Sequence, residues 1–310
     1  MHDSGLEEYL TRLARMPAEL AERARAFAAE DSTRRTAAGG FSLIEHACHL
    51  ADLEERAFAL RIGRLRREDN PALPDFDGAA AAAAGRYQER PLGPALAAFA
   101  SARARSVELL REVRREEWSR AGTQQGVGSV TLGDMPRLMA EHDAAHGQEL
   151  DALRAEQVVA ELAGAPERVR SVLAEFDAAA LRRPPAIAPL DAEALSAIGH
   201  ACHLRDIEID GYHARIRRTR EDSNPHLPSL DSERLALERA YDGADPAEAL
   251  RAFEIARQQT VVTLGGVAPA EWSRPADFEG YGAVTLLGLI EILSGHDRVH
   301  VAALAAMPRR

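Results

Sequence analysis

The chain has 310 residues, the length of two ordinary domains, and 46% of them are hydrophobic while 28% are charged. This composition excludes a disordered chain. The formal charge of -11, with 38 basic side chains that are all arginine, argues against a general binder of nucleic acid or of an anionic membrane. Two cysteines are too few for a disulfide framework, so we expect a reducing, cytoplasmic compartment. No apolar run approaches the ~20 residues of a membrane span, and the acidic start MHDSGLEEYL differs from a signal peptide.

The first half of the sequence predicts a helix near the N-terminus and a second one after a turn. Apolar residues recur at helical spacing in LEEYLTRLARMPAELAERARAFAAE, where Pro17 is a candidate kink. Ser42 and Glu45 have the spacing of a capping box at the start of the second helix. This helix is expected to end before the turn signal Asn70-Pro71.

Two further helices are predicted after a long connection, which has a short helix in its alanine run. Pro94 opens the third long helix, which continues to about Val113. Thr131 or Asp134 caps the fourth, which carries the sequence HDAAH. Strand signals are nearly absent, so each half is expected to be a four-helix bundle with one long crossover.

The second half repeats the first at a shift of 154 residues. HACHL at 46–50 recurs at 200–204, EWSR at 117–120 recurs at 271–274, and HDAAH at 142–146 corresponds to HDRVH at 296–300. Between 46 and 146 the halves align without a gap and share 39 of 101 residues. We therefore predict an all-α protein of two tandem four-helix bundles related by internal duplication, with copy 1 at 1–155 and copy 2 at 166–310.

Three histidines in each half form a candidate metal site. Two lie four residues apart, which places both rings on one face of a helix, and a third lies 93 residues upstream on another helix. Three neutral imidazoles would leave coordination positions open for water or substrate. The alternative is a set of ordinary core or surface histidines. The candidate ligands are His49, His142 and His146 in copy 1 and His203, His296 and His300 in copy 2.

Two other metal-site patterns do not fit. A zincin needs the sequence H-E-x-x-H, and Asp143 or Asp297 stands where the glutamate would be. A ferritin-like di-iron site needs Glu-x-x-His pairs, and no such set recurs in both halves. We expect Asp143 and Asp297 to cap a helix or to pair with an arginine.

Other matched residues have two interpretations each. Asp52 and Asp206 follow the upstream histidines by three residues, and could orient an imidazole or form a surface ion pair with arginine. Arg103 and Arg257 could bind an anionic substrate group, but we favour a structural ion pair. His46 and His200 are also matched, three residues before the upstream ligands.

The matched cysteines and tryptophans are expected to be packing residues. Cys48 and Cys202 stand next to the upstream histidines on a rotated helical face, where a small buried thiol is favoured over a reactive one. Trp118 and Trp272 lie in the EWSR turn before the last loop. That loop differs between the copies, TQQGVGSV in one and DFEGYGAV in the other, so the two sites are open to different ligands.

The residues as a set resemble the DinB-like superfamily of metalloenzymes, in two tandem copies. The pattern His-x2-His-Leu-x-Asp-x-Glu, then Arg-Ile, then Asn-Pro-x-Leu-Pro, then His-Asp-x2-His is similar to its DinB_2 branch. The resemblance covers nearly the whole chain and implies a four-helix bundle with the six named histidines as metal ligands. It implies one divalent metal per bundle, Zn, Ni or Fe, and a dimer geometry made within one chain.

The resemblance also implies a function. Relatives in the superfamily include thiol-dependent S-transferases and isomerases that use small thiols such as mycothiol or bacillithiol. A metal held by three imidazoles would lower the pKa of a bound thiol and supply a thiolate. The expected partner is thus a small-molecule thiol, with no nucleic acid and no membrane. The alternative function is a non-catalytic metal-binding or stress-associated helical module.

Overall fold

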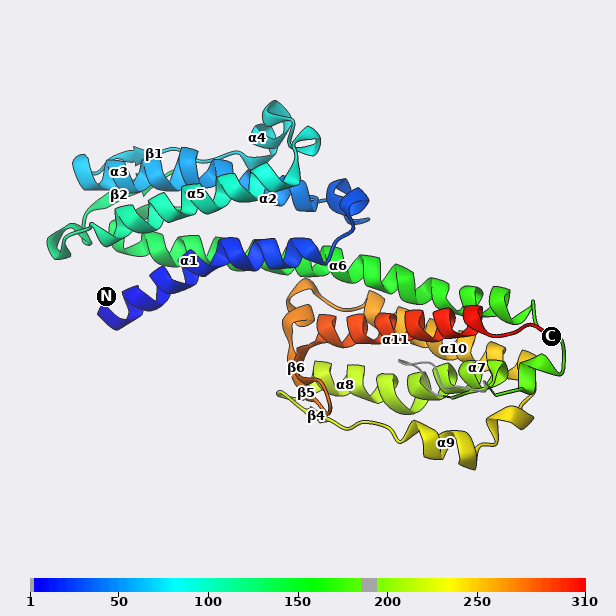
Figure 1. Cartoon of the computed structure of the whole chain (residues 1–310). Coiled ribbons are helices and arrows are strands. Elements are labelled where there is room, and N and C mark those ends of the chain that lie inside the picture. Colours follow the sequence, from blue (N-terminus) through cyan, green and yellow to red (C-terminus); the bar gives the residue numbers. More distant parts are fainter. Residues whose placement is uncertain (1–2, 185–193) are drawn as a thin grey trace. The chain divides into compact units, whose positions relative to one another are not determined.

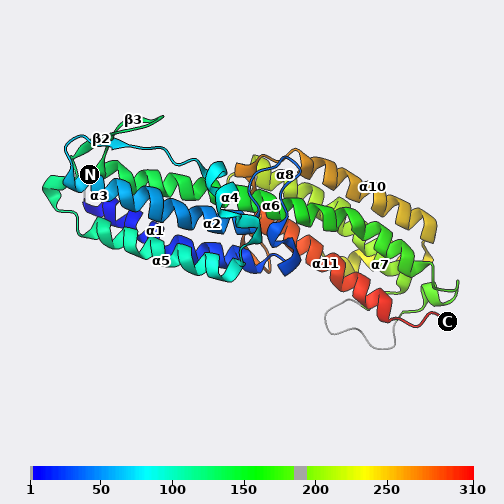
Figure 2. The same cartoon turned by 90° about the horizontal axis from the view of Figure 1, so that it is seen from above.

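Four helical segments lie side by side in the first unit of the chain, Met1–Arg154, in the computed structural model, which describes residues 3–184 and 194–310 (Figure 1). The segments are α1 (Asp3–Arg25), the run from α2 (Leu43–Leu53) to α3 (Ala59–Arg67), α5 (Leu92–Arg111) and the first part of α6 (Met135–Leu173). Seen from above, α2, α5 and α6 run along one another (Figure 2). The predicted four-helix bundle is confirmed.

The second unit, Ala155–Arg310, repeats this order of elements. Its helical segments are the last part of α6, the run from α7 (Ala197–Asp206) to α8 (His213–Glu221), α10 (Pro246–Gly265) and α11 (Leu286–Ala306). The stretch 155–165, between the two predicted copies, belongs to α6. None of the helices in the described residues has both the length and the apolar character that a bilayer crossing requires.

Local sequence explains where these helices begin and how they continue. Glu45 accepts a hydrogen bond from the backbone N–H of Ser42 (2.9 Å), which is the reciprocal half of the predicted capping box. α1 passes through Pro17 without ending. The run from α2 to α3 contains one wider π-helical turn, Glu54–Phe58, and the second unit has the same feature at Ile207–Tyr212. Such a turn adds a residue to the helix, so it changes which side chains face the core.

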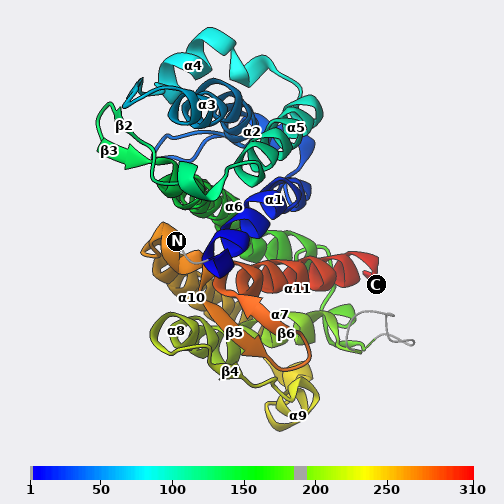
Figure 3. The same ribbon diagram turned by 90° about the vertical axis from the view of Figure 1, so that its left-hand side faces the viewer.

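Each unit also contains a small three-stranded sheet, for which the sequence contained almost no signal (Figure 3). In the first unit β1 (Ala72–Leu73) pairs parallel with β2 (Ala121–Gln124), and β2 pairs antiparallel with β3 (Gly128–Thr131). The second unit repeats the arrangement with β4 (His226–Leu227), β5 (Pro275–Phe278) and β6 (Gly282–Thr285). Strands of two to four residues are too short to show a period-two pattern in the sequence.

The hairpin that precedes the fourth helix depends on glycine. Gly126 and Gly128 have φ angles of 79° and 100°, in the left-handed region that other residues seldom adopt. Both glycines recur at 280 and 282, so the two hairpins share a backbone while their side chains differ. The short helices α4 (Gly78–Gly85) and α9 (Ser232–Glu238) belong to the two crossovers, and α4 is the helix predicted in the alanine run.

A polar layer separates two apolar clusters in the core of the first unit. Along α5, Phe99 belongs to one cluster and Val107 to the other, with buried Arg103 between them. Along α6, Ala140 and Leu150 belong to different clusters in the same way. The candidate ligands of α6 lie in the interval between those two residues, so the histidines share the polar layer with the arginine.

Candidate metal centres

Three histidine rings from two helices converge in the first unit. α2 carries His49, and α6 carries His142 and His146 one turn apart. His49 Nε2 lies 3.4 Å from His142 Nε2, which lies 3.2 Å from His146 Nε2. The structure thus brings together the three residues that the sequence singled out in this half, with one candidate ligand atom from each within 4.8 Å of the others.

The second unit contains the same arrangement. α7 carries His203, and α11 carries His296 and His300. The Nε2 atoms of His203 and His296 are 3.0 Å apart, and those of His296 and His300 are 3.1 Å apart. Both predicted triads are therefore assembled, each by one helix that contributes a single ring and another that contributes two.

Burial favours the neutral form of His49 and His142. Removal from water is the main cause and the neighbouring imidazoles add to it, and together they lower the pKa of His49 to about 4 and that of His142 to about 3. The same causes lower the pKa of His203 and of His296 to about 3. A neutral imidazole has one ring nitrogen with a free lone pair, which is the form that binds a metal.

The spacing of the nitrogens fits a metal ion. Two imidazole nitrogens that each lie about 2.0–2.1 Å from a tetrahedral Zn²⁺ are about 3.3 Å apart. The neighbouring Nε2 atoms of the two centres lie between 3.0 and 3.4 Å apart. Three imidazole donors suit Zn, Ni, Fe or Cu, and they leave coordination positions for a further ligand.

A fourth histidine contacts each centre from behind. His46 Nδ1 lies 2.9 Å from His146 Nδ1, and His200 Nδ1 lies 2.8 Å from His300 Nδ1. If Nε2 of His146 is to offer its lone pair, the proton must sit on Nδ1, where it can be donated to His46. The sequence showed His46 and His200 only as a matched pair, and this orienting contact was not predicted.

Asp52 and Asp206 do not orient the ligands. Each accepts a hydrogen bond of 2.7 Å from a buried tyrosine hydroxyl, that of Tyr87 or of Tyr241. Asp52 also pairs with Arg56 at 3.1 Å. The ion-pair interpretation therefore holds, and the contacts of these aspartates fix the crossover segment against the second helix.

A buried ionic cluster lies in the polar layer beside the first centre. Arg103 is 1% exposed, and it donates to Glu54 on one side and to both carboxylate oxygens of Asp143 on the other. Its guanidinium also donates to the Leu13 carbonyl at 3.1 Å. This confirms the structural ion pair predicted for the arginine and the arginine partner predicted for the aspartate. The second unit repeats the cluster with Arg257, Glu208 and Asp297.

The sequence contained one clue to the remaining member of this cluster. Glu54 and Glu208 are matched, two residues after Asp52 and Asp206, but neither was singled out as a buried residue. Both are at most 1% exposed, and each lies in the first two residues of the wider helical turn in its unit. Burial raises the pKa of Glu54, although Arg103 opposes the shift.

The matched cysteines and tryptophans are packing residues, as predicted. Cys48 and Cys202 are buried free thiols, and burial raises the pKa of each to about 11. Both thiols therefore stay protonated at neutral pH. Trp118 packs against the apolar cluster of its unit, and Trp272 is buried.

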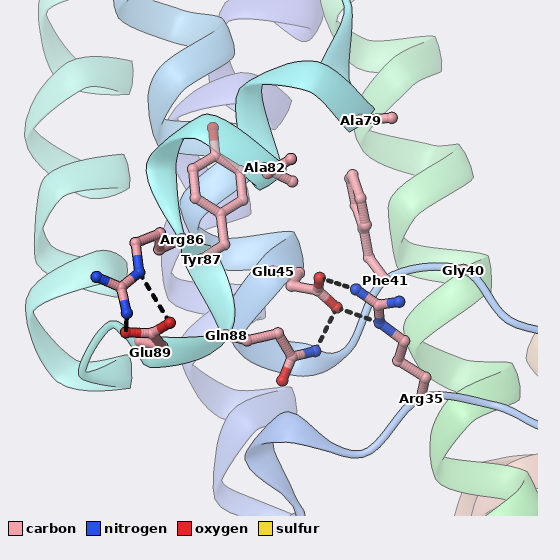
Figure 4. A pocket seen from close by; sticks show the side chains of 11 residues that line it. Arg35, Gly40, Phe41, Glu45, Ala79, Ala82, Arg86, Tyr87, Gln88 and Glu89 are labelled. Atoms are coloured by element: carbon pink, nitrogen blue, oxygen red, sulfur yellow. Dashed lines mark hydrogen bonds and ion pairs between the residues drawn. The ribbon is translucent and has the colours of Figure 1, made fainter.

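A cavity of about 500 Å³ lies near the first centre, and Figure 4 shows the side chains that line it. The ring of Phe41 lines the cavity and lies 5.2 Å from the ring of His49. The figure shows Glu45 held by Arg35 and Gln88 at the cavity wall. The charged side chains of the lining are thus in pairs, Arg35 with Glu45 and Arg86 with Glu89.

The second unit has a cavity of similar size, about 480 Å³, at the matching place. Leu195 stands in the position of Phe41, and Asp242 stands in that of Gln88. Ala240 replaces Arg86, and the charged residues of this lining are the acidic Glu233 and Asp242. The two cavities are thus suited to ligands of different polarity.

Comparison with known proteins gives a family match and a likeness to solved structures. The family model DinB_2, described as the DinB superfamily, matches residues 12–150 and again 161–304. A solved structure titled "YfiT from Bacillus subtilis is a probable metal-dependent hydrolase with an unusual four-helix bundle topology" is similar at 19% identity and a TM-score of 0.46. The likeness covers 49% of this chain and 87% of that one. No curated protein matches the sequence.

Proposed function

We propose that this chain, which belongs to the DinB superfamily, is a metal-dependent enzyme that joins a small thiol to an electrophile at one tri-histidine centre per unit. The observation that carries the proposal is the convergence of three imidazoles in both units. A divalent metal bound there would lower the pKa of a coordinated thiol and make a thiolate available at neutral pH. The metals that we propose are Zn, Ni or Fe.

The chain's own cysteines point to a thiol that comes from outside. Cys48 and Cys202 are buried and protonated, so neither is available as a nucleophile. A co-substrate thiol would form its carbon–sulfur bond as the electrophile's bond to its leaving group breaks, while the thiol proton passes to solvent. In an isomerisation the same thiol would add to a double bond and leave again. A thiol of this kind is abundant in a reducing cytoplasm, where we place the protein.

The residues around each centre have separate tasks in this proposal. The three imidazoles hold the metal, and His46 or His200 fixes the proton of one ligand on Nδ1. The cavity beside Phe41 is the candidate place for the electrophile in the first unit, since this ring lines the cavity and also packs near His49. The second lining, which has two carboxylates and no arginine, would accept a different electrophile.

Metal content tests the first step of this proposal. The purified chain should contain two metal ions, and His142→Ala and His296→Ala should each contain one. The variant with both substitutions should contain none. A wild-type chain that binds no Zn²⁺, Ni²⁺ or Fe²⁺ would refute the proposal.

Conjugation tests the second step. The metal-loaded chain is incubated with cysteine, glutathione, mycothiol or bacillithiol and with monobromobimane, and product formation is measured against the double histidine variant. We expect a thiol-dependent rate that is lost in that variant and after chelation. A chain with two tightly bound metals and no such rate, over a panel of further electrophiles, would favour the non-catalytic metal-binding module.

A further inference from the structure

The two centres differ in a carboxylate that contacts a ligand ring. Glu149 follows His146 by one helical turn in the first unit, and Ala303 occupies the matching place after His300. The three ligands and the histidine behind them are the same in both units. The duplication therefore offers two versions of one site, with and without a carboxylate.

The carboxylate of Glu149 lies against the ring nitrogen that faces away from the centre. Its Oε2 atom is 3.2 Å from His146 Nδ1 and 3.7 Å from His46 Nε2. His46 Nδ1 lies 2.9 Å from the same His146 nitrogen. A proton on His146 Nδ1 therefore has two acceptors, one of which is anionic, and both hold the ring in the form whose Nε2 faces the other ligands.

The second unit has only the imidazole acceptor at this place. His300 Nδ1 lies 2.8 Å from His200 Nδ1, and the methyl side chain of Ala303 offers no polar atom. A carboxylate behind a histidine ligand raises the basicity of the ring and offsets part of the charge of a bound cation. The first centre has this contribution and the second lacks it.

We propose that Glu149 is a positioning residue that makes the first centre bind its metal more tightly than the second. The proposal rests on the metal binding put forward under the proposed function. Loss of such an outer partner lowers metal affinity by about 10- to 100-fold. The Glu149 side chain is 57% exposed, and water screens its charge, so we expect the lower part of this range, about tenfold.

The same atoms allow a second interpretation, which the experiment separates. His46, His146 and Glu149 each offer one candidate ligand atom, and these three atoms lie within 4.8 Å of one another. Such a grouping could itself hold a cation. A cation there would share the ring of His146 with the metal of the tri-histidine centre, and that ring would then carry no proton on either nitrogen. A hydrogen bond needs no such deprotonation, so we favour the orienting role.

The test measures Zn²⁺ affinity at each centre of the full-length chain, by competition with a chromophoric chelator. His296→Ala leaves only the first centre intact, and His142→Ala leaves only the second. The first centre should bind Zn²⁺ about tenfold more tightly than the second. Adding Glu149→Ala should weaken binding by about tenfold in the His296→Ala chain and leave the His142→Ala chain unchanged. Glu149→Gln keeps an acceptor for the Nδ1 proton of His146, so it should lower the Zn²⁺ affinity less than Glu149→Ala does.

A spectroscopic measurement separates positioning from a general loss of structure. The visible absorption of bound Co²⁺ should change with Glu149→Ala in the His296→Ala chain and stay the same in the His142→Ala chain. Far-ultraviolet circular dichroism should be the same for all variants. A shift in Co²⁺ absorption with unchanged helix content is what an altered ligand environment produces.

The outcomes that overturn the proposal are distinct. Equal affinities at the two centres, or an effect of Glu149→Ala below about twofold, would remove the role of this residue. Two ions bound by the His296→Ala chain, with one lost on Glu149→Ala, would establish the second cation instead. Absence of metal from every variant and from the wild type would overturn the proposed function together with this inference. The expected affinities without any thiol chemistry would refute only the catalytic part of the proposed function.

Discussion

Removing the buried arginine of the first unit should destabilise that unit far more than a surface change would. We choose Arg103→Met, because methionine keeps much of the volume and loses the charge and all four hydrogen bonds. The change leaves Glu54 and Asp143 side by side in the core, at 1% and 5% exposure, with no cation between them. Breaking a buried ion pair in this way costs about 3–5 kcal/mol.

The expected shift in urea unfolding follows from this free energy. With a slope of about 2 kcal/mol per molar urea, a loss of about 4 kcal/mol lowers the midpoint by about 2 M. Each unit contains one of the two tryptophans, so fluorescence of a Trp272→Phe chain reports on the first unit through Trp118. Arg257→Met in a Trp118→Phe chain is the matched measurement on the second unit, and it should give a loss of the same size.

A second variant tests the reason for the loss. If the cost arises from uncompensated carboxylates, adding Glu54→Gln and Asp143→Asn to Arg103→Met should restore most of the stability, because the isosteric amides remove both charges. If Arg103→Met alone lowered the free energy of unfolding by less than about 1 kcal/mol, the reasoning would be refuted. So would a triple variant that is no more stable than the single one, since packing and not charge would then explain the loss.

Three further changes should have smaller or more local effects. Without metal, the free energy of unfolding should be constant above pH ~7 and fall as the pH drops below this value. The cause is that histidines of the unfolded state bind protons with the ordinary pKa of ~6.5, whereas in the folded state the pKa is about 4 for His49 and about 3 for His142. At pH 5.5 each such ring should cost about 1.4 kcal/mol, and a flat profile between pH 5 and 8 in urea titrations would contradict this. Gly78→Ala would place its Cβ 2.7 Å from the Cε1 atom of His49, so we expect weaker Zn²⁺ binding at the first centre. The control is Gly93→Ala, which has open space around it and should leave stability unchanged or raise it by about 0.5–1 kcal/mol. Equal Zn²⁺ affinities for the two variants would argue against the contact with His49. Asp77→Ala removes the side chain that accepts a first-turn N–H of α4, and it should cost about 1 kcal/mol in thermal unfolding with no change in metal content.

The repeated histidines could be predicted from the sequence because helix geometry fixes them closely. Residues four apart on a helix share a face, so His142 and His146 needed only the correct helix assignment to be placed together. The shift of 154 residues then separated the matched histidines from those with no counterpart. The upstream ligand was a weaker prediction, because sequence spacing alone does not say which faces of two distant helices meet.

Other features could not be predicted, each for a physical reason. The strands are too short for a sequence period, and the glycines of TQQGVGSV were the only local sign of a hairpin. A π-helical turn has no marker in a single sequence, so the inward position of Glu54 stayed hidden. The contact between His46 and His146 joins residues 100 positions apart, and Glu149 matters only once that contact is known.

The buried ionic cluster gives each unit a way to place its ligands before any metal arrives. Arg103, on α5, holds Glu54 in the run that carries His49 and holds Asp143, which is adjacent to the ligand His142 on α6. The two helices that supply the ligands are thus joined through a third, within about two turns of the rings. A cluster with one cation and two carboxylates is a poor source of net stability, because the cost of burying the charges offsets most of their attraction. Its presence in both units is better explained by the orientation it imposes: it fixes the rotation of α6 about its axis, on which the convergence of the imidazoles depends.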